Sequence, residues 1–567
     1  KIYFIFYVLI GNILLVAENF HEAISCYKKS AEIAKKINDS DIESLAYMGM
    51  GNAFFSLKKY KEAIQSYRLC LKVNKINMKI LSRASILSNL GKCFAELSDF
   101  QESEKYFRES ISIYSKIQNN LKDNFEWKIS IFEGQAKAYI EFEKMLLKKG
   151  KIKEALEIAD ARRSRALVGR LFKNLNPEHI LNIEEGTYIS SEKMQLLAQK
   201  LKTTFIIYSF SPLENHKKGI GAWIISFEGN IKWQLLPSSD LLEELKDSNK
   251  LFDTYPYKNP ASSLSLVDRV STLKTMKNEF QKRLKEWYKT LIAPIEKFLP
   301  SDPSQTLTII PDKFLSQIPF ACFEDENGKY LIEKYPINFA PSLTVLQLLD
   351  KSPQIFPQTF LLACNPKTPN LKDNGLKQTK TEVEDIVRLL PKSISHKILT
   401  KDAPKVGVIL EEIPDARWTH LACHGMIGDK LEEKLDPHSV FEGFFKLVAD
   451  EKHPNGYLYA QEIASVALKA ELVFLSSCHS GRGKLQQEGT IGPNWAFLAA
   501  GALSTIASYW PVPDTPTTVK MVKIFYKHLI IEKLNKAQAI QKAILAGMAE
   551  GRENYRQWGV FFLSGLI

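Results

Sequence analysis

The chain has 567 residues, too many for a single hydrophobic core, and this length predicts about three domains, or fewer if one is large. Hydrophobic residues make up 45% and charged residues 25% of the sequence, as in an ordinary globular protein. The net charge of +12 is spread along the chain instead of forming a basic arm, so we expect neither a nucleic acid nor a membrane as partner. Seven cysteines without regular spacing argue against a disulfide framework and for a reducing, cytoplasmic location.

The first twenty residues, KIYFIFYVLIGNILLVAENF, are apolar through Ile10 and do not begin with methionine, so we expect a fragment or a processed product. A signal-peptide core is one interpretation. Gly11 and Asn12 interrupt the apolar run, however, and a membrane-spanning helix needs roughly 20 apolar residues. We therefore expect a buried first helix of the array described next.

The first third of the chain repeats itself. Three sets of residues recur at an interval of 40 positions: Gly11, Gly51 and Gly91; Ala23, Ala63 and Ser103; Tyr27, Tyr67 and Phe107. Each glycine is followed by a polar turn that ends in an aromatic residue, in the segments ENFHEA, KKYKEA and SDFQES. This pattern predicts helical hairpins in which small residues sit where two helices approach closely and the aromatic residue fills the gap to the next pair.

These repeats resemble the tetratricopeptide repeat, in a form longer than the usual 34 residues. The resemblance covers about residues 7 to 120, with a degenerate fourth unit expected around Gly134 to Ala159. Such an array implies a concave surface for a protein partner, and we find no catalytic constellation in it. Its cysteines, Cys26, Cys70 and Cys93, occupy apolar helical positions and are expected to pack in the core.

The chain then changes character. Lys149 to Phe172 is a basic helical segment that we interpret as a joint to the next domain; a solvated helix face is the alternative. From about Lys200, apolar segments alternate with helical ones: TTFIIYSF, GAWIISFEGNIKWQLLP, LTIIP, FLLACNP, HKIL, WTHLAC, ELVFLSSC and STIASYW read as strands. Near-continuous apolar strands between helices predict an α/β domain with a mainly parallel sheet covered by helices on both faces.

Two Cys-His pairs lie where ligands gather in such a sheet, beyond the carboxyl ends of strands. WTHLAC is followed by His424 and Gly425, and ELVFLSS is followed by Cys478. A nucleophilic cysteine needs a base, an exposed position at a strand end and backbone amides that face the developing oxyanion. Adjacent strands can bring His424 and Cys478 together, and glycines 425 and 481 let the backbone approach a substrate carbonyl.

Two other interpretations compete with catalysis. A metal site would use both pairs, but neighbouring residues on a strand point to opposite faces and the spacing lacks the gap typical of zinc ligands, so we expect no metal and no cofactor. A purely structural role suits Cys423, which precedes the histidine within the apolar strand. It suits Cys478 poorly, because SSCHSGRG is small, polar and loop-like.

Several segments resemble the successive landmarks of the CHAT domain, a caspase-like, separase-related cysteine peptidase family often fused to tetratricopeptide repeats. They are THLACHG, VFLSSCHSG, EGTIGPNWAFLAAGALSTIASYWPVPD and WGVFFLSG, and upstream LIAPIEKFLP, LTIIPDKFLSQIPFACF and YLIEKYPINFAPSLTVL. The match spans roughly residues 195 to 567. The resemblance implies that His424 is the general base, that Cys478 is the nucleophile, and that His420, Cys423 and His479 are bystanders.

The chain also departs from the family. His479 and Ser480 replace a more usual acidic residue and threonine, and Pro513 replaces the first acid of a common WPVDD pattern. The dyad is intact, but substrate preference cannot be carried over. Asp514 is a candidate wall of a pocket for a basic side chain, or a structural loop carboxylate.

Taken together, we expect a repeat array at residues 1–170, a linker at 171–194 and a CHAT peptidase domain at 195–567. The expected function is a cysteine endopeptidase, with amides of Gly425 and Cys478 as oxyanion donors and a protein substrate and protein regulator bound by the array. The alternative is a non-catalytic interaction scaffold that keeps the peptidase fold as a docking module.

Overall fold

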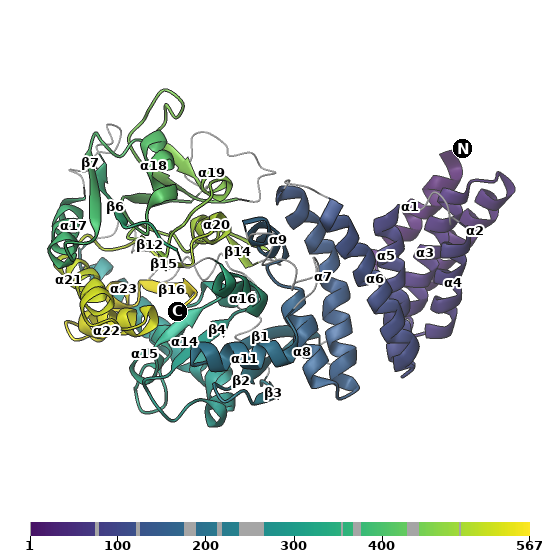
Figure 1. The fold of residues 1–567 in the computed structure, drawn as a ribbon. Coiled ribbons are helices and arrows are strands. Elements are labelled where there is room, and N and C mark those ends of the chain that lie inside the picture. The colour runs from purple at the N-terminus through teal and green to yellow at the C-terminus, as the bar shows by residue number, and fades with distance from the viewer. Residues whose placement is uncertain are drawn as a thin grey trace. The chain divides into compact units, whose positions relative to one another are not determined.

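The computed structural model describes residues 2–73, 79–120, 125–174, 189–212, 218–237, 266–352, 355–366, 376–427, 441–486 and 489–567. These residues divide into two compact units, Lys1–Arg162 and Arg163–Ile567 (Figure 1). The segment 175–188, most of the expected linker at 171–194, lies outside the described residues. None of the described helices is both long and apolar enough to cross a membrane.

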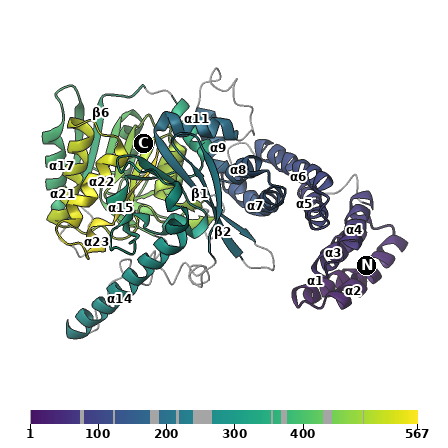
Figure 2. The same ribbon diagram turned by 90° about the horizontal axis from the view of Figure 1, so that it is seen from below.

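The first unit is an array of antiparallel helix pairs, as the 40-residue repeat predicts (Figure 2). Its helices are α1 (Ile2–Val16), α2 (Phe20–Lys36), α3 (Ser40–Ser56), α4 (Tyr60–Val73), α5 (Ile80–Glu96), α6 (Phe100–Asn120), α7 (Phe125–Lys148) and α8 (Ile152–Ala161). The expected fourth unit, Gly134 to Ala159, falls on the last pair, α7 and α8. The turns inside the first three pairs hold Glu18, Lys58 and Ser98 in the left-handed region, with φ of 60°, 58° and 61°.

The repeated glycines make room for the repeated aromatic rings. A Cβ on Gly11 would lie 2.6 Å from the ring of Tyr27, and one on Gly49, in the next helix pair, would lie 2.5 Å from the same ring. Tyr27 is fully buried between them. The aromatic residue therefore fills the space inside its own pair and the space to the next one, which explains why glycine and tyrosine recur together.

The first helix differs from the prediction of a buried helix. Val8 and Gly11 are buried against the array, but six apolar residues of α1 are exposed: Ile5, Phe6, Leu9, Ile10, Ile13 and Val16. The hydrophobic run is continuous around the helix, whereas α2 and α3 cover only part of it. Periodicity in the sequence could not separate the two faces, since both are apolar.

The basic segment Lys149 to Phe172 is helical as predicted, but it is two helices instead of one. The helix α8 ends at Ala161 and α9 (Arg165–Asn174) begins after a break at residues 162–164, where the two units divide. The side chain of Arg162 is 1% exposed and forms an ion pair of 3.4 Å with Glu143, so this part of the segment is not a solvated face.

The second unit is built on an 11-stranded sheet with the order β3-β2-β1-β4-β5-β16-β15-β12-β8-β6-β7. These strands are β1 (Thr203–Pro212), β2 (Lys218–Ile225), β3 (Ile231–Leu235), β4 (Thr306–Ile310), β5 (Ile337–Phe339), β6 (Thr359–Pro366), β7 (Ser395–Lys401), β8 (Trp418–Ala422), β12 (Leu472–Leu475), β15 (Ser504–Ser508) and β16 (Phe561–Gly565). The pairings β1 with β2, β2 with β3 and β15 with β16 are antiparallel, and the other neighbours are parallel. The mainly parallel sheet expected from the sequence is therefore present.

Helices cover both faces of this sheet (Figure 1). Those on one face include α17 (Lys377–Leu389), α21 (Pro516–Tyr526) and α22 (Lys536–Met548); those on the other include α9, α16 (Leu343–Lys351) and α20 (Pro493–Ala500). Further α-helices among the described residues are α11 (Ser191–Leu201), α14 (Leu266–Trp287), α15 (Leu331–Lys334), α18 (Val406–Glu412), α19 (Ala460–Ser465) and α23 (Tyr555–Trp558). The central strands β8 and β12 are completely buried, as continuous apolar strands require.

Two small sheets lie beyond the main one. One is formed by β9 (His424–Met426), β10 (Phe444–Lys446) and β11 (Tyr457–Tyr459), and the other by the hairpin of β13 (Lys484–Gln486) and β14 (Gly489–Ile491). Each of these strands has three residues, which is too short for a periodic pattern to reveal from sequence. In the sequence, β9 begins at His424 itself, and β13 begins at Lys484, shortly after Cys478 and His479.

Candidate active site

The pairing of β8 with β12 determines where His424 and Cys478 lie. The two strands are parallel neighbours, and Leu421 lies opposite Leu475. Leu475 follows Leu421 by 54 residues, and Cys478 follows His424 by the same 54 residues. The two residues therefore leave the sheet at the same level, at the carboxyl ends of adjacent strands. Both of them line one small cavity there.

The turn that carries Cys478 is held by hydrogen bonds to the end of β15. The hydroxyl of Ser508 donates to the carbonyl oxygen of Ser477 at 2.7 Å and accepts from the backbone amide of Ser480 at 3.2 Å. The amide of Gly481 donates to the carbonyl of Ser508 at 2.9 Å. His479 lies in the left-handed region with φ of 56°, where a side chain is strained. This tight turn leaves Cys478 half-buried at the strand end.

Gly425 lies against the backbone of Cys478. A Cβ added to Gly425 would lie 2.1 Å from the carbonyl oxygen of Cys478 and 3.3 Å from its amide nitrogen. No other amino acid has room for this approach. The two residues from which we expect oxyanion donors are thus in direct backbone contact.

Asp514 lines the same cavity as His424 and Cys478. Its two carboxylate oxygens accept the backbone amides of Lys377 and Gln378 at 2.9 and 3.0 Å, so it also holds the first turn of α17. A carboxylate at this place stabilises the helix N-terminus. Asp514 thus has the contacts of a structural carboxylate and also lines a cavity, and its role as the wall of a pocket for a basic side chain stays a prediction.

A second acid at this cavity has no clear signal in the sequence. Glu382 is 3% exposed, lines the cavity and shares a hydrogen bond of 2.7 Å with Nε2 of His420. The other ring nitrogen of His420 lies 3.2 Å from the hydroxyl of Tyr526. His420 is fully buried and does not line the cavity, as its interpretation as a bystander requires. Glu382 lies inside an amphipathic helix, where buried and exposed acids look alike in sequence.

Among the influences on the pKa of the Cys478 thiol, burial is the largest. It raises the pKa of the Cys478 thiol, while the backbone amide of Val512, the charge of Arg556 and the amide of Cys478 itself act in the opposite direction. Val512 lies in the WPVPD segment and Arg556 lies in α23, and the sequence alone does not show that both act on Cys478. The groups that stabilise a thiolate are in place, but the thiol is mostly neutral near pH 7.

Of the other members of the Cys-His pairs, Cys423 also lines this cavity and His479 does not. Cys423 is 2% exposed, its sulfur lies 3.5 Å from the hydroxyl of Ser477, and burial raises its pKa to about 12. Nδ1 of His479 lies 3.5 Å from a guanidinium nitrogen of Arg482. Across the part of the chain that the structure describes, no group of three or more His, Cys, Asp or Glu residues is placed to hold a metal ion.

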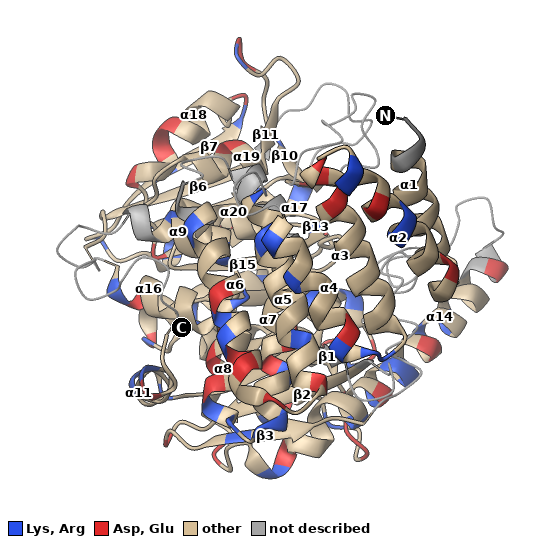
Figure 3. Ribbon diagram, turned by 90° about the vertical axis from the view of Figure 1, so that its right-hand side faces the viewer, with Lys and Arg blue, Asp and Glu red and all other residues tan. Residues whose placement is uncertain are grey.

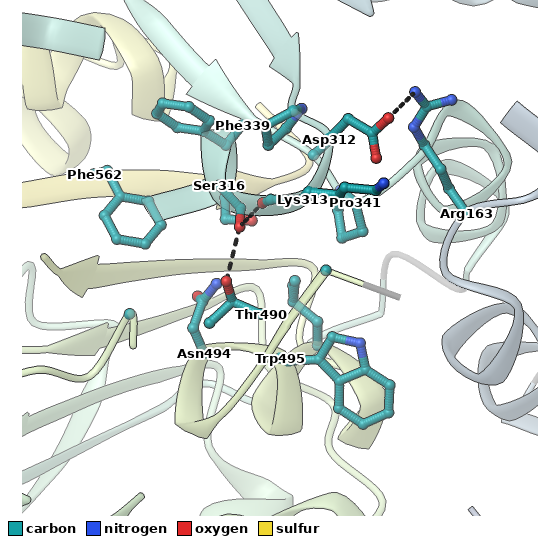
Figure 4. Close-up of a pocket in the computed structure, with 16 residues that line it drawn as sticks. Arg163, Asp312, Lys313, Ser316, Phe339, Pro341, Thr490, Asn494, Trp495 and Phe562 are labelled. Atoms are coloured by element: carbon teal, nitrogen blue, oxygen red, sulfur yellow. Dashed lines mark hydrogen bonds and ion pairs between the residues drawn. The ribbon is translucent and has the colours of Figure 1, made fainter. Parts of the chain in front are cut away.

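A second cavity lies against the segment that follows Cys478 (Figure 4). The hydroxyls of Ser316 and Thr490 lie 2.8 Å apart and connect β14 to the short 3-10 helix Lys313–Gln317 that follows β4. Asn494 accepts a hydrogen bond from Thr505, and its backbone amide donates to the carbonyl of Ser480 at 3.1 Å. The hairpin thus lines this cavity through Gly489 and Thr490, and α20, which follows it, is hydrogen-bonded to the turn of Cys478.

Comparison with known proteins identifies both parts of the chain. Residues 4–75 and 84–117 match the tetratricopeptide repeat, and residues 281–566 match the CHAT domain. Tetratricopeptide repeat protein 28 of Homo sapiens is 24% identical over 53% of this chain, which spans 14% of that protein. Outer dynein arm-docking complex subunit 4 of Danio rerio is 25% identical over 22% of this chain and 25% of its own length.

Among solved structures, a separase–securin complex of Saccharomyces cerevisiae is similar over 99% of this chain and 47% of that chain, with 11% identity and a TM-score of 0.48. The match to the CHAT domain covers half of the sequence and includes His424, Gly425 and Cys478. On that match, the chain belongs to the CHAT domain family and carries tetratricopeptide repeats ahead of the domain.

Proposed function

We propose that this protein is a cysteine endopeptidase in which Cys478 is the nucleophile and His424 is the general base. The observation that supports the proposal most strongly is the shared 54-residue offset, which brings these two residues to one cavity from adjacent strands. In the proposed reaction His424 removes the thiol proton as sulfur attacks the peptide carbonyl. The protonated imidazole then gives this proton to the leaving amine, and water hydrolyses the thioester.

The raised pKa of Cys478 favours one form of this mechanism. A thiol that is mostly neutral at rest must lose its proton as it attacks, so His424 acts as a general base and not as the partner of a stable thiolate. The amide of Val512 and the charge of Arg556 stabilise sulfur as its negative charge develops.

The amides of Gly425 and Cys478 are the proposed oxyanion donors. Their support is the backbone contact between the two residues, which only glycine at position 425 permits. Two amides from adjacent segments can bind one oxyanion if both point at the same place, and such donors contribute strongly to acyl transfer.

We further propose that the cavity beside the dyad accepts a basic side chain, with Asp514 as one wall. A lysine or arginine here meets the carboxylates of Asp514 and Glu382, both of which line the cavity. Because both oxygens of Asp514 already accept backbone amides, its contribution is a fixed negative charge and not a flexible partner. Replacement of Asp514 by asparagine is expected to raise KM for a basic peptide more than it lowers kcat.

The repeat array is proposed to recruit the protein substrate or a protein regulator in the cytoplasm. No nucleic acid, membrane or cofactor forms part of this proposal. Partner binding is proposed to control the segment from Gly481 to Gly492, because this segment begins in the turn of Cys478, where the amide of Arg482 donates to the carbonyl of His479 at 2.9 Å. Saturation with partner would then raise the rate even on a short peptide that does not reach the array.

The test of the peptidase uses its own cysteines as controls. Cys26 and Cys478 are half-buried, and the other five cysteines are buried. Cys26→Ala is therefore the matched control for Cys478→Ala. We expect cleavage of a candidate protein substrate by the wild type and by Cys26→Ala, and none by Cys478→Ala. Equal cleavage by all three proteins would show that Cys478 is not the nucleophile.

A second candidate is an interaction scaffold in which the peptidase fold no longer catalyses, which the unusual residues His479 and Ser480 after Cys478 favour. A peptide probe with a thiol-reactive group separates the two. Selective labelling of Cys478 near neutral pH that is lost in His424→Ala supports the peptidase. Labelling that is unaffected by His424→Ala supports the scaffold.

A further inference from the structure

The second cavity, of about 70 Å³, shares no described residue with the cavity that His424 and Cys478 line (Figure 4). Gly481, three residues after Cys478, belongs to its wall. Residues of α20 line this cavity and residues of α17 line the cavity of the dyad, and the two helices cover opposite faces of the sheet. The turn of the nucleophile therefore separates two cavities, and we call the one beside Gly481 the rear cavity.

The ring of Phe562 connects the rear cavity to the turn of the nucleophile. It lines the cavity and packs so closely on Gly481 that no Cβ would fit there. The same ring stacks on Tyr509, with the ring centroids 4.4 Å apart, directly after the end of β15. A group that fills the rear cavity therefore contacts a ring that supports the turn of Cys478.

Two hydrogen-bond donors of the rear cavity lie next to each other. The hydroxyl of Thr505 donates to the side-chain oxygen of Asn494 and lies 3.4 Å from the carbonyl oxygen of Ser564. In the part of the chain that the structure describes, neither the amide group of Asn494 nor the hydroxyl of Ser564 has a hydrogen-bond acceptor, although Ser564 is only 4% exposed. A buried donor without an acceptor is costly, so this corner favours a ligand with an oxygen acceptor.

Two other hydroxyls of the wall are already satisfied. Ser316 donates to the carbonyl oxygen of Lys313 at 2.7 Å, and the hydroxyl of Thr490 lies 2.8 Å from that of Ser316. Since a hydroxyl has one hydrogen, Thr490 is the donor to Ser316, and neither residue has a hydrogen left for a ligand. The need for an acceptor is thus localised at Asn494 and Ser564.

Positive charge exceeds negative charge by one among the described residues of the wall. Arg163 pairs with Asp312 at 3.9 Å, so these two charges balance each other. Lys313 is the additional cation and lies beside this pair at one end of the cavity (Figure 4). Asn494 and Phe562 lie at the other end. The rear cavity thus has a cationic end and an end with hydrogen-bond donors.

Charges on the outside of α6 and α8 are arranged differently. Figure 3 shows basic and acidic residues mixed there. Glu104 pairs with Arg108, Lys149 and Lys151, and Glu154 pairs with Arg108 and Lys151. These exposed charges satisfy one another, so we expect only weak attraction of anions at this surface.

The size and the walls of the rear cavity restrict its ligand further. Its volume is about half of the roughly 150 Å³ of a cavity that holds benzene, so an aromatic group is too large. Between the two ends the wall includes the apolar side chains of Phe339, Pro341 and Leu498. Burial of a doubly charged phosphate against such side chains is costly when only one cation is in excess. A monocarboxylate with a small apolar group and a second oxygen acceptor matches the size, the charge and the donors.

We propose that the rear cavity binds an acylated amino acid with a small side chain and a free carboxylate, the chemistry found at the C-terminus of a peptide. The carboxylate lies at the end of Lys313, and the acyl oxygen accepts from Asn494 and Ser564. The bound group supports Phe562 and thereby holds the turn in the arrangement in which Cys478 is half-buried. This binding does not require that the protein cleaves peptides, so it goes beyond the proposed function.

Saturation-transfer NMR on the full chain measures binding, with N-acetylalanine as the probe. N-acetylalaninamide, which has no charge, and N-acetylphenylalanine, which is too large, are the controls. We expect a dissociation constant of about 1 mM for N-acetylalanine, as its few atoms allow, and at least about tenfold weaker binding of both controls. No binding of N-acetylalanine at about 10 mM, or equal binding of the amide, would overturn the proposal and leave a cavity that holds water only.

A longer probe distinguishes the two sources of this chemistry. Acetyl-Ser-Gly-Ser-Gly-Ala with a free carboxylate is tested on Cys478→Ala, so that the peptide stays intact. Binding at least as tight as that of N-acetylalanine identifies the ligand as a peptide C-terminus. Binding of N-acetylalanine alone identifies it as a small metabolite. The amidated peptide should bind in neither case, and binding of this form would contradict the role of the carboxylate.

Isosteric variants locate the site. Asn494→Asp keeps the oxygen that accepts from Thr505 but replaces the donor by a negative charge, so it should weaken binding at least about tenfold. Asn535→Asp makes the same change at the exposed N-cap of α22 and should leave the affinity within about twofold. Equal effects of the two variants, with both proteins folded by circular dichroism, would contradict the site.

The cationic end is tested in the same way. Lys313 lies 5.7 Å from the ring centroid of Phe210, and the exposed Lys297 lies 4.9 Å from that of Phe298. Lys313→Gln should weaken binding of N-acetylalanine by about fivefold or more, whereas Lys297→Gln should leave it within about twofold. Unchanged affinity in Lys313→Gln would contradict the proposed position of the carboxylate.

Alkylation by iodoacetamide measures the link to the nucleophile turn. Saturation with N-acetylalanine should slow the alkylation of Cys478 at least about twofold and leave that of Cys26, the other half-buried cysteine, unchanged. Asn535→Asp should keep this protection and Asn494→Asp should lose it. An unchanged rate at Cys478 despite measured binding would refute the link. Because alkylation needs no cleavage, binding without cleavage refutes only the peptidase, and cleavage without binding refutes only this site.

Discussion

Replacement of Gly425 by alanine tests the backbone contact on which the proposed oxyanion site depends. The new Cβ would lie 2.1 Å from the carbonyl oxygen of Cys478 and 3.2 Å from its carbonyl carbon. Both obstacles are backbone atoms, so a change of side-chain rotamer cannot relieve them. The strand β9 or the turn of Cys478 has to move.

The size of this movement follows from ordinary contact distances. A carbon atom and a carbonyl oxygen approach to about 3.3 Å, so the two segments must separate by about 1 Å. A displacement of about 1 Å at a catalytic group costs about 100-fold in rate. Overpacking of this kind costs about 1 to 3 kcal/mol of folding free energy. We therefore expect a folded variant that has lost about 99% of its activity.

The assay compares peptide hydrolysis by the wild type, Gly425→Ala and a matched control, Gly551→Ala. At Gly551 the new Cβ would meet only the Cβ of Asn554, at 3.5 Å, which is an ordinary contact. The control should keep its activity within about twofold, and thermal unfolding shows that each protein is folded. Activity of Gly425→Ala within about threefold of the wild type would refute the reasoning, because 1 Å of displacement could not then leave the reaction intact.

Three further predictions follow from other contacts. Because burial raises the pKa of Cys478, its alkylation by iodoacetamide should keep accelerating above about pH 9; a plateau already reached near about pH 6 would instead indicate a stable thiolate. Tyr67→Phe removes the 2.8 Å bond to Asn52 and should lower the free energy of unfolding by about 1 kcal/mol in urea titrations, and an unchanged stability would refute this. His453 lies 2.9 Å from both Asp450 and Glu462, which raise its pKa against the effect of burial. The ion pairs of protonated His453 stabilise the folded state fully below about pH 6.5, and this stabilisation is lost as pH rises through the raised pKa. The melting temperature of the wild type should therefore fall more between about pH 6 and 9 than that of His453→Gln. Parallel plots of melting temperature against pH for the two proteins would contradict this.

The repeat array shows what sequence can predict well. Gly11, Gly51 and Gly91 recur because each faces an aromatic ring, and that contact needs glycine wherever the hairpin is repeated. A steric requirement repeated at a fixed interval leaves a visible pattern. The exposed face of α1 could not be predicted, because exposure depends on which neighbours are present and not on the residues of the helix alone.

The proximity of His424 and Cys478 could be predicted from the sequence for a similar reason. Parallel strands deliver their next residues to one edge of the sheet, so WTHLAC and ELVFLSSC already place His424 and Cys478 near each other. The sequence did not reveal Val512, Arg556 or Glu382, which reach the site from loops and helices. Val512 lies in the WPVPD segment quoted above, but the contact of all three residues with the site depends on tertiary packing, which the sequence does not show.

Asp514 shows in a single residue what the sequence alone cannot predict. The sequence suggested either a pocket wall or a structural carboxylate, and the structure shows that it lines the cavity while both of its oxygens accept amides of α17. A sequence separation of 136 residues between Asp514 and Gln378 carries no local signal. Whether this charge selects substrates is decided by the comparison of KM and kcat proposed above.

The central claim is that Cys478 and His424 together cleave peptide bonds, and cleavage profiling tests it most directly. A library of peptides from a protein digest is incubated with the wild type, Cys26→Ala, Cys478→Ala and His424→Ala, and new peptide ends are identified by mass spectrometry. We expect the same new ends with the wild type and Cys26→Ala, and none with Cys478→Ala or His424→Ala. New ends that persist in Cys478→Ala, or a wild type that produces none, would contradict it.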